Sequence, residues 1–135
     1  MSDLNISIET GFVDVDNTSF QFPYTVTGMT ITEIESDTES MSLIFYVDVV
    51  DSSGKLDVTF DRSFFDSIYD EVDDEFFVLA DGDETSSMEI QTTSNNRSLS
   101  IDVPYGTEEL EIIGSEFGFS KEISIPVVET PVVET

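Results

Sequence analysis

The sequence contains no cysteine, histidine or tryptophan, and only 4 of its 135 residues are lysine or arginine. Without cysteine there is neither a disulfide framework nor a thiolate metal site, so the redox compartment stays open. Without histidine the chain lacks the commonest general base and the usual transition-metal ligand. Phosphate backbones and anionic lipid surfaces both require lysine and arginine clusters. The composition therefore excludes nucleic acid as an expected partner.

Long apolar runs are also missing. No segment approaches the roughly 20 apolar residues that span a bilayer, and the opening MSDLNISIET has neither the basic region nor the apolar region of a signal peptide. Two interpretations follow: a cytosolic protein, or a segment of a longer secreted precursor. We favour the second on the grounds given below, and we expect an extracellular or cell-surface location without membrane insertion.

Acidic residues are abundant. The chain has 30 aspartates and glutamates and a formal net charge of −26, whereas about 2–8 charges suffice to keep a small domain soluble. Self-repulsion of this size destabilises a compact state. Salt relieves it, because the Debye length falls to about 3 Å at 1 M ionic strength. The charge therefore predicts a saline, cation-rich medium, with inorganic cations among the partners.

Apolar and polar residues alternate along most of the chain, which is typical of strands with one buried face. Phe20–Val26 has every second residue apolar. Met41–Val50 carries apolar residues on both faces, which predicts a central strand covered on both sides. Further strands are predicted at Leu4–Ile8, Met29–Ile34, Lys55–Phe60, Phe76–Ala80, Ser87–Gln91, Ser98–Val103, Glu108–Ile113 and Glu122–Val128.

This pattern predicts an all-β fold, an antiparallel immunoglobulin-like β-sandwich with one short crossover helix. Turns at 51–54, 80–83, 94–97 and 104–107 are expected to join antiparallel neighbours. The helix is predicted within 61–72, where Phe64, Phe65, Ile68 and Val72 have helical spacing after Ser63. We divide the chain into an N-terminal strand and extension (1–18), a sandwich domain (19–120), and a C-terminal strand with a proline-led repeat (121–135).

Four stretches form a recognisable series: FPYTVTG (22–28), LDVTFDRSFFDS (56–67), DDEFFVLADGDE (73–84) and RSLSIDVPYGTEELEIIG (97–114). The series resembles a β-domain of secreted and surface-layer-associated proteins of ammonia-oxidising archaea, found before a C-terminal Pro-Glu-Phe-Gly sorting signal. The resemblance covers about residues 20–114 and implies an archaeal cell-surface module without enzyme activity. The chain departs from the pattern at 115–120, where SEFGFS has no proline before Glu-Phe-Gly and no apolar anchor follows.

Two kinds of modification or ligand site are predicted. Asn5, Asn17 and Asn96 each begin an Asn-X-Ser/Thr sequon for glycosylation. Carboxylates gathered on loops are the ligands that Ca²⁺ requires, in the weak range of about 10⁻⁴–10⁻³ M found in extracellular modules. The alternative is that these are solvated acidic turns. The candidate calcium ligands are Asp70, Glu71, Asp73, Asp74, Asp81 and Asp83.

Arg62 is expected to pair with carboxylates such as Asp61, Asp66 or those of 70–75, and so to hold the short helix on the sheet. The phenylalanines are expected in the core, the alternative being a carbohydrate-stacking platform. Pairs of carboxylates could serve a glycosidase, but among 30 acids such pairs arise by chance. No catalytic residue and no resident cofactor is assigned, calcium apart, and the chain is not predicted to be an enzyme.

The function expected from these observations is a non-enzymatic extracellular structural module, an acidic coat or spacer domain with weak binding of Ca²⁺ or other cations. The alternative is a specific binding module for a carbohydrate or for a partner's strand. In that case the terminal strands at 4–8 and 122–128 would add to a neighbour's sheet edge and build filaments. The expected partners are other coat proteins or further copies of the chain.

Overall fold

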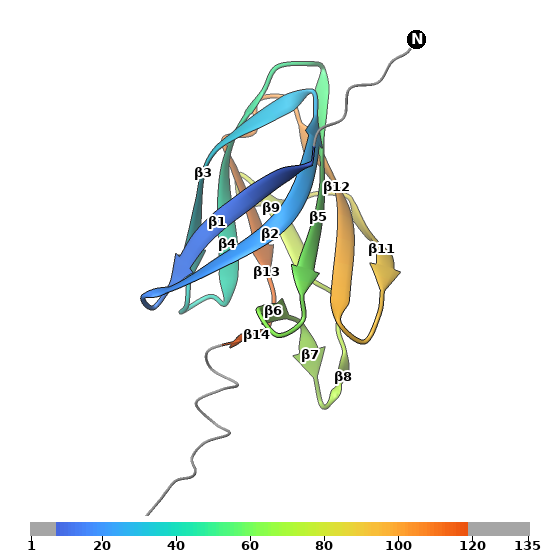
Figure 1. Ribbon diagram of the computed structural model, residues 1–135. Helices are drawn as coiled ribbons and strands as arrows, with labels where there is room; N and C mark the ends of the chain where they lie inside the picture. Colours follow the sequence, from blue (N-terminus) through green and yellow to red (C-terminus); the bar gives the residue numbers. More distant parts are fainter. Residues whose placement is uncertain (1–7, 119–135) are drawn as a thin grey trace, which may run out of the picture.

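The computed structural model describes residues 8–118 (Figure 1). They form two five-stranded antiparallel sheets that face each other, which confirms the all-β prediction. The first sheet has the order β1 (Glu9–Val15), β2 (Thr18–Thr27), β5 (Ser53–Asp61), β12 (Asn96–Pro104), β11 (Ser87–Thr92). The second has the order β10 (Asp83–Glu84), β9 (Phe77–Ala80), β13 (Glu109–Ile113), β4 (Ser42–Val49), β3 (Met29–Asp37). Residues 4–7 of the predicted N-terminal strand and the tail predicted at 121–135 lie outside the described residues.

The core lies between the two sheets, where the alternating residues of both inner faces meet. On β2, Phe22 is buried and its alternate neighbours are partly buried against the core. On β4, Leu43 and Phe45 are fully buried, and the strand is central, between β13 and β3. On its second face, Ile44 and Tyr46 are only partly buried. The predicted central position is therefore confirmed, whereas the predicted cover on both sides is not.

The aromatic residues are mostly core, as predicted. Phe22, Phe64, Phe65 and Phe76 are buried, and their rings contact one another and other phenylalanines at centroid distances of 4.5–6.1 Å. Phe77, the neighbour of Phe76, is 46% exposed. Consecutive residues of an extended chain point in opposite directions, which explains why only one of this pair is buried.

Only two of the four predicted turns make hairpins. The turn at 80–83 joins β9 to β10, with Asp81 and Gly82 at positive φ as type I′ turns require, and 94–97 joins β11 to β12. The predictions for 51–54 and 104–107 were wrong, because these turns pass from one sheet to the other. Turn residues specify a reversal of the chain but do not specify which sheet receives the next strand.

The predicted crossover helix is absent from the described residues, and that prediction was wrong. Residues 61–73 form β6 (Phe65–Asp66), which pairs with β14 (Glu116–Phe117), and the hairpin of β7 (Ile68–Tyr69) with β8 (Val72–Asp73). Asp70 and Glu71 have φ of 54° and 67°, which ends any right-handed helix there. Within residues 8–118 no helix is long and apolar enough to cross a membrane.

Strand β1 comes from the segment that the sequence analysis placed in the N-terminal extension. It pairs with β2 along its whole length, from Glu9 opposite Tyr24 to Val15 opposite Thr18. Asp16 and Asn17 make the tight turn between the two strands, with φ of 48° and 70°. Aspartate and asparagine tolerate this left-handed conformation better than most residues. Residues 9–15 therefore form an edge of the first sheet.

Candidate functional site

Arg97 is the most unusual side chain of the described residues because it is a buried charge. It occupies the inward phase of β12, which it shares with Leu99, Ile101 and Val103, and its side chain is only 3% exposed. A buried charge is costly unless it is paired and hydrogen-bonded. Arg97 was not among the site residues predicted from the sequence, although its position in the alternation of β12 would have identified it.

All five N–H donors of the Arg97 guanidinium are used. Its Nε donates to Oε2 of Glu89 at 2.8 Å, and one terminal nitrogen donates to Oε1 of Glu89 at 2.8 Å and to the carbonyl of Asp74 at 2.6 Å. The other donates to Oδ1 of Asp66 at 2.9 Å and to the carbonyl of Ser67 at 2.7 Å. The guanidinium carbon also lies 4.8 Å from the centroid of the Phe76 ring. This side chain has no donor left for a substrate.

Asp66 links Arg97 to the other arginine of the sequence, Arg62. It is 3% exposed, and its Oδ2 accepts a hydrogen bond from Nε of Arg62 at 3.1 Å. Arg62 also makes a bidentate pair with the carboxylate of Asp73 and donates to the carbonyl of Thr93 at 3.0 Å. We call Arg62, Asp66, Asp73, Glu89 and Arg97 the arginine cluster. The prediction that Arg62 pairs with Asp66 and the 70–75 run is confirmed, but the segment it holds is not helical.

The hydrogen bonds of the cluster change the acidity of its members. Hydrogen bonding to Arg97 lowers the pKa of Glu89, and hydrogen bonding to Arg62 lowers the pKa of Asp73. The pKa of Arg97 is raised by its hydrogen bonds to Glu89 and Asp66, against the opposing effect of burial. All three groups are therefore held in their charged forms at neutral pH.

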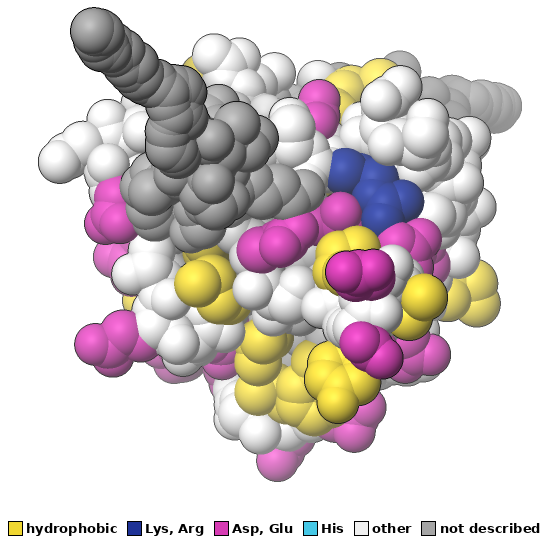
Figure 2. Space-filling view, turned by 90° about the horizontal axis from the view of Figure 1, so that it is seen from below, with side chains coloured by type: hydrophobic (Ala, Val, Ile, Leu, Met, Phe, Trp, Pro, Cys, Tyr) yellow, Lys and Arg dark blue, Asp and Glu magenta, His cyan; other side chains and the backbone are white. Residues whose placement is uncertain are grey.

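The cluster takes the place of the predicted helix in tying the 61–75 segment to the sheets. Arg97 comes from β12, Glu89 from β11, and Asp66 from β6, so three strands meet at one guanidinium. Figure 2 looks at this end of the molecule and shows basic side-chain atoms bordered by acidic ones. Because the arginines are saturated by the protein's own groups, the arrangement serves structure and has no free acid, base or nucleophile aimed at a ligand.

Replacing Glu89 by glutamine tests the link between the cluster and pH. At pH 7 we expect the variant to lose about 1–3 kcal/mol of unfolding free energy, because an amide NH₂ would face the N–H groups of Arg97. A folded-state pKa below the ordinary value of 4.5 gives stability that is complete above about pH 4.5 and is lost as pH falls through the lowered pKa. The difference between wild type and variant should therefore shrink from pH 5 to pH 3 in urea titrations.

The change in net charge with pH affects both proteins almost equally, so it cancels in this difference. Asp48→Asn, at an exposed position of β4, is the control and should show little difference at any pH. A gap between wild type and Glu89→Gln that stayed constant from pH 7 to pH 3 would contradict the charge-based account of the Glu89–Arg97 pair.

The six predicted calcium ligands lie at the two ends of β9. Asp70 and Glu71 are at the tip of the β7–β8 hairpin, and Asp73 is paired with Arg62. Asp81 follows β9, and its carboxylate accepts hydrogen bonds from the backbone N–H groups of Glu108 and Glu109 at 2.9–3.3 Å. These hydrogen bonds hold the first residue of β13, Glu109, beside Asp81. The carboxylates of Asp73 and Asp81 are thus already paired with groups of the protein itself.

The remaining predicted ligands do not close a site around these two. Asp74 precedes β9 and its Oδ1 accepts from the N–H of Glu75 at 2.9 Å, while Asp83 begins β10 at the other end. Within residues 8–118 no group of three or more acidic side chains is arranged to hold a metal ion. Calcium binding by these residues stays a prediction.

The predicted glycosylation sites have different settings. Asn5 lies outside the described residues. Asn17 is exposed in the β1–β2 turn, and Asn96 is exposed at the start of β12. The rest of the Asn96 sequon is buried, because Arg97 belongs to the arginine cluster and Ser98 lies 2.8 Å from the hydroxyl of Thr59. Of the two described sequons, that of Asn17 is therefore the more open in the folded chain.

The chain matches no protein-family model, no curated protein and no solved structure. The resemblance to the archaeal surface-layer-associated domain therefore stays a prediction from the motifs alone, and the function has to be argued from the molecule itself.

Proposed function

We propose that the chain is a non-enzymatic structural module of a cell surface or of a secreted protein, an immunoglobulin-like β-sandwich that acts as an acidic coat or spacer. The module presents a body whose exposed charged side chains are almost all acidic. Cations gather around it, and other coat proteins or further copies of the chain are its neighbours. The proposal includes the archaeal, surface-layer-associated setting implied by the motif resemblance.

One observation carries the proposal: the few basic residues do not neutralise the surface. Both arginines are used inside the arginine cluster, where their side chains are 3% and 17% exposed. Among the described residues, Lys55 is the one basic side chain that is half exposed, and its Nζ lies 4.0 Å from Asp102. Most acidic side chains of residues 8–118 are therefore displayed to solvent, in a sequence whose formal net charge is −26. Such a surface attracts cations over a Debye length and repels anions.

The positions of the acids favour a diffuse layer of cations over one tight site. The predicted calcium ligands are divided between the two ends of β9, and Asp73 and Asp81 already have partners. A specific calcium site needs about six to eight oxygen ligands around one point. Weak, distributed cation binding requires no such convergence.

A second function, partner-strand addition, is supported by the edge of the first sheet. Strand β11 lies at this edge, and its sequence SMEIQT contains neither lysine nor proline, the residues that commonly protect edges. Met88 and Ile90 on this strand are 64% and 55% exposed. Concentration-dependent association in sedimentation velocity would support this function.

Salt titration tests the acidic-surface proposal. We expect the thermal midpoint to rise by about 10 °C between 10 mM and 1 M NaCl, because screening removes self-repulsion worth roughly 2 kcal/mol. CaCl₂ and MgCl₂ at equal ionic strength should raise the midpoint equally. A larger rise with CaCl₂ would instead support a specific calcium site, since binding to the native state alone raises the midpoint.

A charge-reduced variant is the matched control. Asp48→Asn, Asp83→Asn, Glu84→Gln and Glu108→Gln together remove four negative charges from exposed positions. This variant should have a higher midpoint at 10 mM NaCl and a smaller rise with salt. If the thermal midpoint of the wild type were independent of NaCl, repulsion between the acidic side chains would not affect stability. The proposal would then fail.

A further inference from the structure

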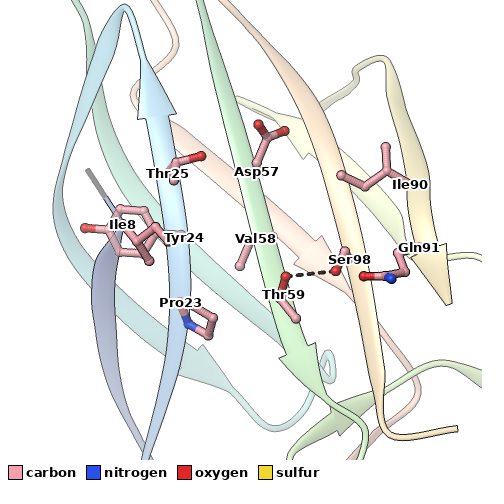
Figure 3. Close-up of a pocket in the computed structure, with 10 residues that line it drawn as sticks. All are labelled: Ile8, Pro23, Tyr24, Thr25, Asp57, Val58, Thr59, Ile90, Gln91 and Ser98. Atoms are coloured by element: carbon pink, nitrogen blue, oxygen red, sulfur yellow. Dashed lines mark hydrogen bonds between the residues drawn. The ribbon is translucent and has the colours of Figure 1, made fainter. Parts of the chain in front are cut away.

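The outer face of the first sheet carries a groove of about 400 Å³ (Figure 3), on the side of β11 and β12 opposite to the inward-facing Arg97. Ligand pockets commonly have about 300–1,000 Å³, so a small organic group fits. The groove crosses β2, β5, β12 and β11. Its lining residues are Ile8, Pro23, Tyr24, Thr25, Asp57, Val58, Thr59, Ile90, Gln91 and Ser98.

Asp57 supplies the polar centre of this groove. It lies on β5 with Thr25 of β2 opposite it on one side and Ser100 of β12 on the other. Its Oδ1 is buried and accepts no hydrogen bond from the described residues. An ionised carboxylate is an acceptor only, and a buried acceptor without a donor is costly. A group that completes this site must therefore bring a hydrogen-bond donor.

The charge around Asp57 selects among donors. The lining contains no lysine or arginine. The nearest basic residue in sequence, Lys55, lies on the same strand and has its ion pair with Asp102. An anionic ligand would meet an unpaired carboxylate and a net charge of −26, whereas a cationic donor gains both the hydrogen bond and the attraction.

The walls of the groove select for an apolar stem beside the charge. Strand β11 has a bulge between Glu89 and Gln91, and Ile90 is the extra residue. Figure 3 shows Ile90 and Gln91 reaching from β11 toward β12, with Asp57 between them and β2. Pro23 and Ile8 form apolar wall on the side of β2. A bulge commonly re-aims a side chain toward a functional surface.

Two hydroxyl groups of the floor are engaged with each other. Thr59 and Ser98 lie side by side at 2.8 Å and hydrogen-bond to each other, and Ser98 is only 7% exposed although it faces outward. Asp57 is the one charged group among the lining residues. The strongest polar contact that this lining offers is therefore to a cationic donor.

We propose that this groove binds a primary alkylammonium group, with its N–H donated to the carboxylate of Asp57 and its alkyl stem directed toward Ile90. A free alkylamine and a lysine side chain of a partner protein share this chemistry. The site is selective for shape as well as charge, so it goes beyond the general attraction of cations to the acidic surface.

The test is a titration of the full chain followed by amide chemical shifts in two-dimensional NMR at constant ionic strength. With n-butylammonium we expect saturable shifts confined to β2, β5, β12 and β11. Ammonium lacks the alkyl stem and its apolar contacts, and 1-butanol lacks the charge-assisted hydrogen bond. Each should therefore bind at least about tenfold more weakly than n-butylammonium. Nα-acetyl-lysine amide, compared with n-butylammonium, distinguishes a protein lysine from a free amine.

Two variants and one control complete the test. Asp57→Asn should weaken n-butylammonium binding at least about tenfold, and Ile90→Ser should reduce the preference for n-butylammonium over methylammonium. Asp48→Asn removes the same charge from an exposed position of β4 in the other sheet and should leave binding unchanged. Amide dispersion verifies that each variant is folded. Equal binding of ammonium and n-butylammonium, or an Asp57→Asn variant that binds as wild type does, would overturn the proposal.

Discussion

Replacing Arg97 by methionine is expected to lower the free energy of unfolding by about 3–5 kcal/mol, as is typical when one partner of a buried ion pair is removed. Methionine fills much of the space of the arginine stem but donates no hydrogen bond. It removes both Arg97 hydrogen bonds of Glu89, which keeps the bond from the hydroxyl of Thr92. It also removes the Arg97 donors to the carbonyls of Asp74 and Ser67, although the carbonyl of Ser67 still accepts from the N–H of Asp74. Urea unfolding at pH 7 and fixed salt measures the loss.

Arg97→Lys and Lys55→Met are the matched controls. Lysine keeps the charge but has three donors and no planar fork, so an intermediate loss is expected. Lys55→Met removes a basic residue from a half-exposed pair at 4.0 Å and should cost less than about 1 kcal/mol. If Arg97→Met were no more destabilising than Lys55→Met, the arginine cluster would not be what holds the 61–75 segment.

The cost of losing Arg97 is moderated by Arg62. Asp66 would keep its hydrogen bond from Nε of Arg62, so it would not become an isolated buried charge. Glu89 has no second arginine and would bear most of the loss, which predicts that Glu89→Gln adds little to Arg97→Met. Interacting residues of one network commonly show such non-additive effects.

The strands could be predicted because their signal is local. Every second residue of β4 and β12 is buried, and on β2 Phe22 is buried with partly buried residues two positions away on each side. That alternation is visible in the sequence alone. The same alternation places Arg97 in the core, so its burial was also available from the sequence. Its partners were not, because Glu89 and Asp66 come from separate segments, 8 and 31 residues away, that only the folded sheets bring together.

The features that sequence reasoning got wrong depend on long-range packing. Phe64, Phe65 and Ile68 have the spacing of a helix face, but the segment instead pairs β6 with β14 and turns at Asp70. The turns at 51–54 and 104–107 look like hairpins locally, yet the next strand enters the other sheet. The unpartnered oxygen of Asp57 has no sequence signal, because it depends on which side chains of β2 and β12 lie beside it.

The second large effect is expected for Phe60→Ala, which should lower the free energy of unfolding by about 3–5 kcal/mol. Phe60 is fully buried on β5. Its ring lies 5.1–6.1 Å, between centroids, from those of Phe22, Phe64, Phe65 and Phe76. Those rings come from β2, from the 64–65 segment and from the residue that precedes β9, so alanine would leave a cavity where three parts of the chain meet. Urea unfolding measures the loss.

The control is Phe12→Ala, because Phe12 lies on β1 with 64% of its surface exposed and should cost less than about 1 kcal/mol. Phe60 also contacts the ring of Phe76, on which the guanidinium of Arg97 rests. The cavity and the loss of the ion pair therefore weaken the same contact, and a Phe60→Ala, Arg97→Met double variant should lose less stability than the sum of the two single losses. Strict additivity would mean that the aromatic core and the arginine cluster stabilise this end of the molecule independently.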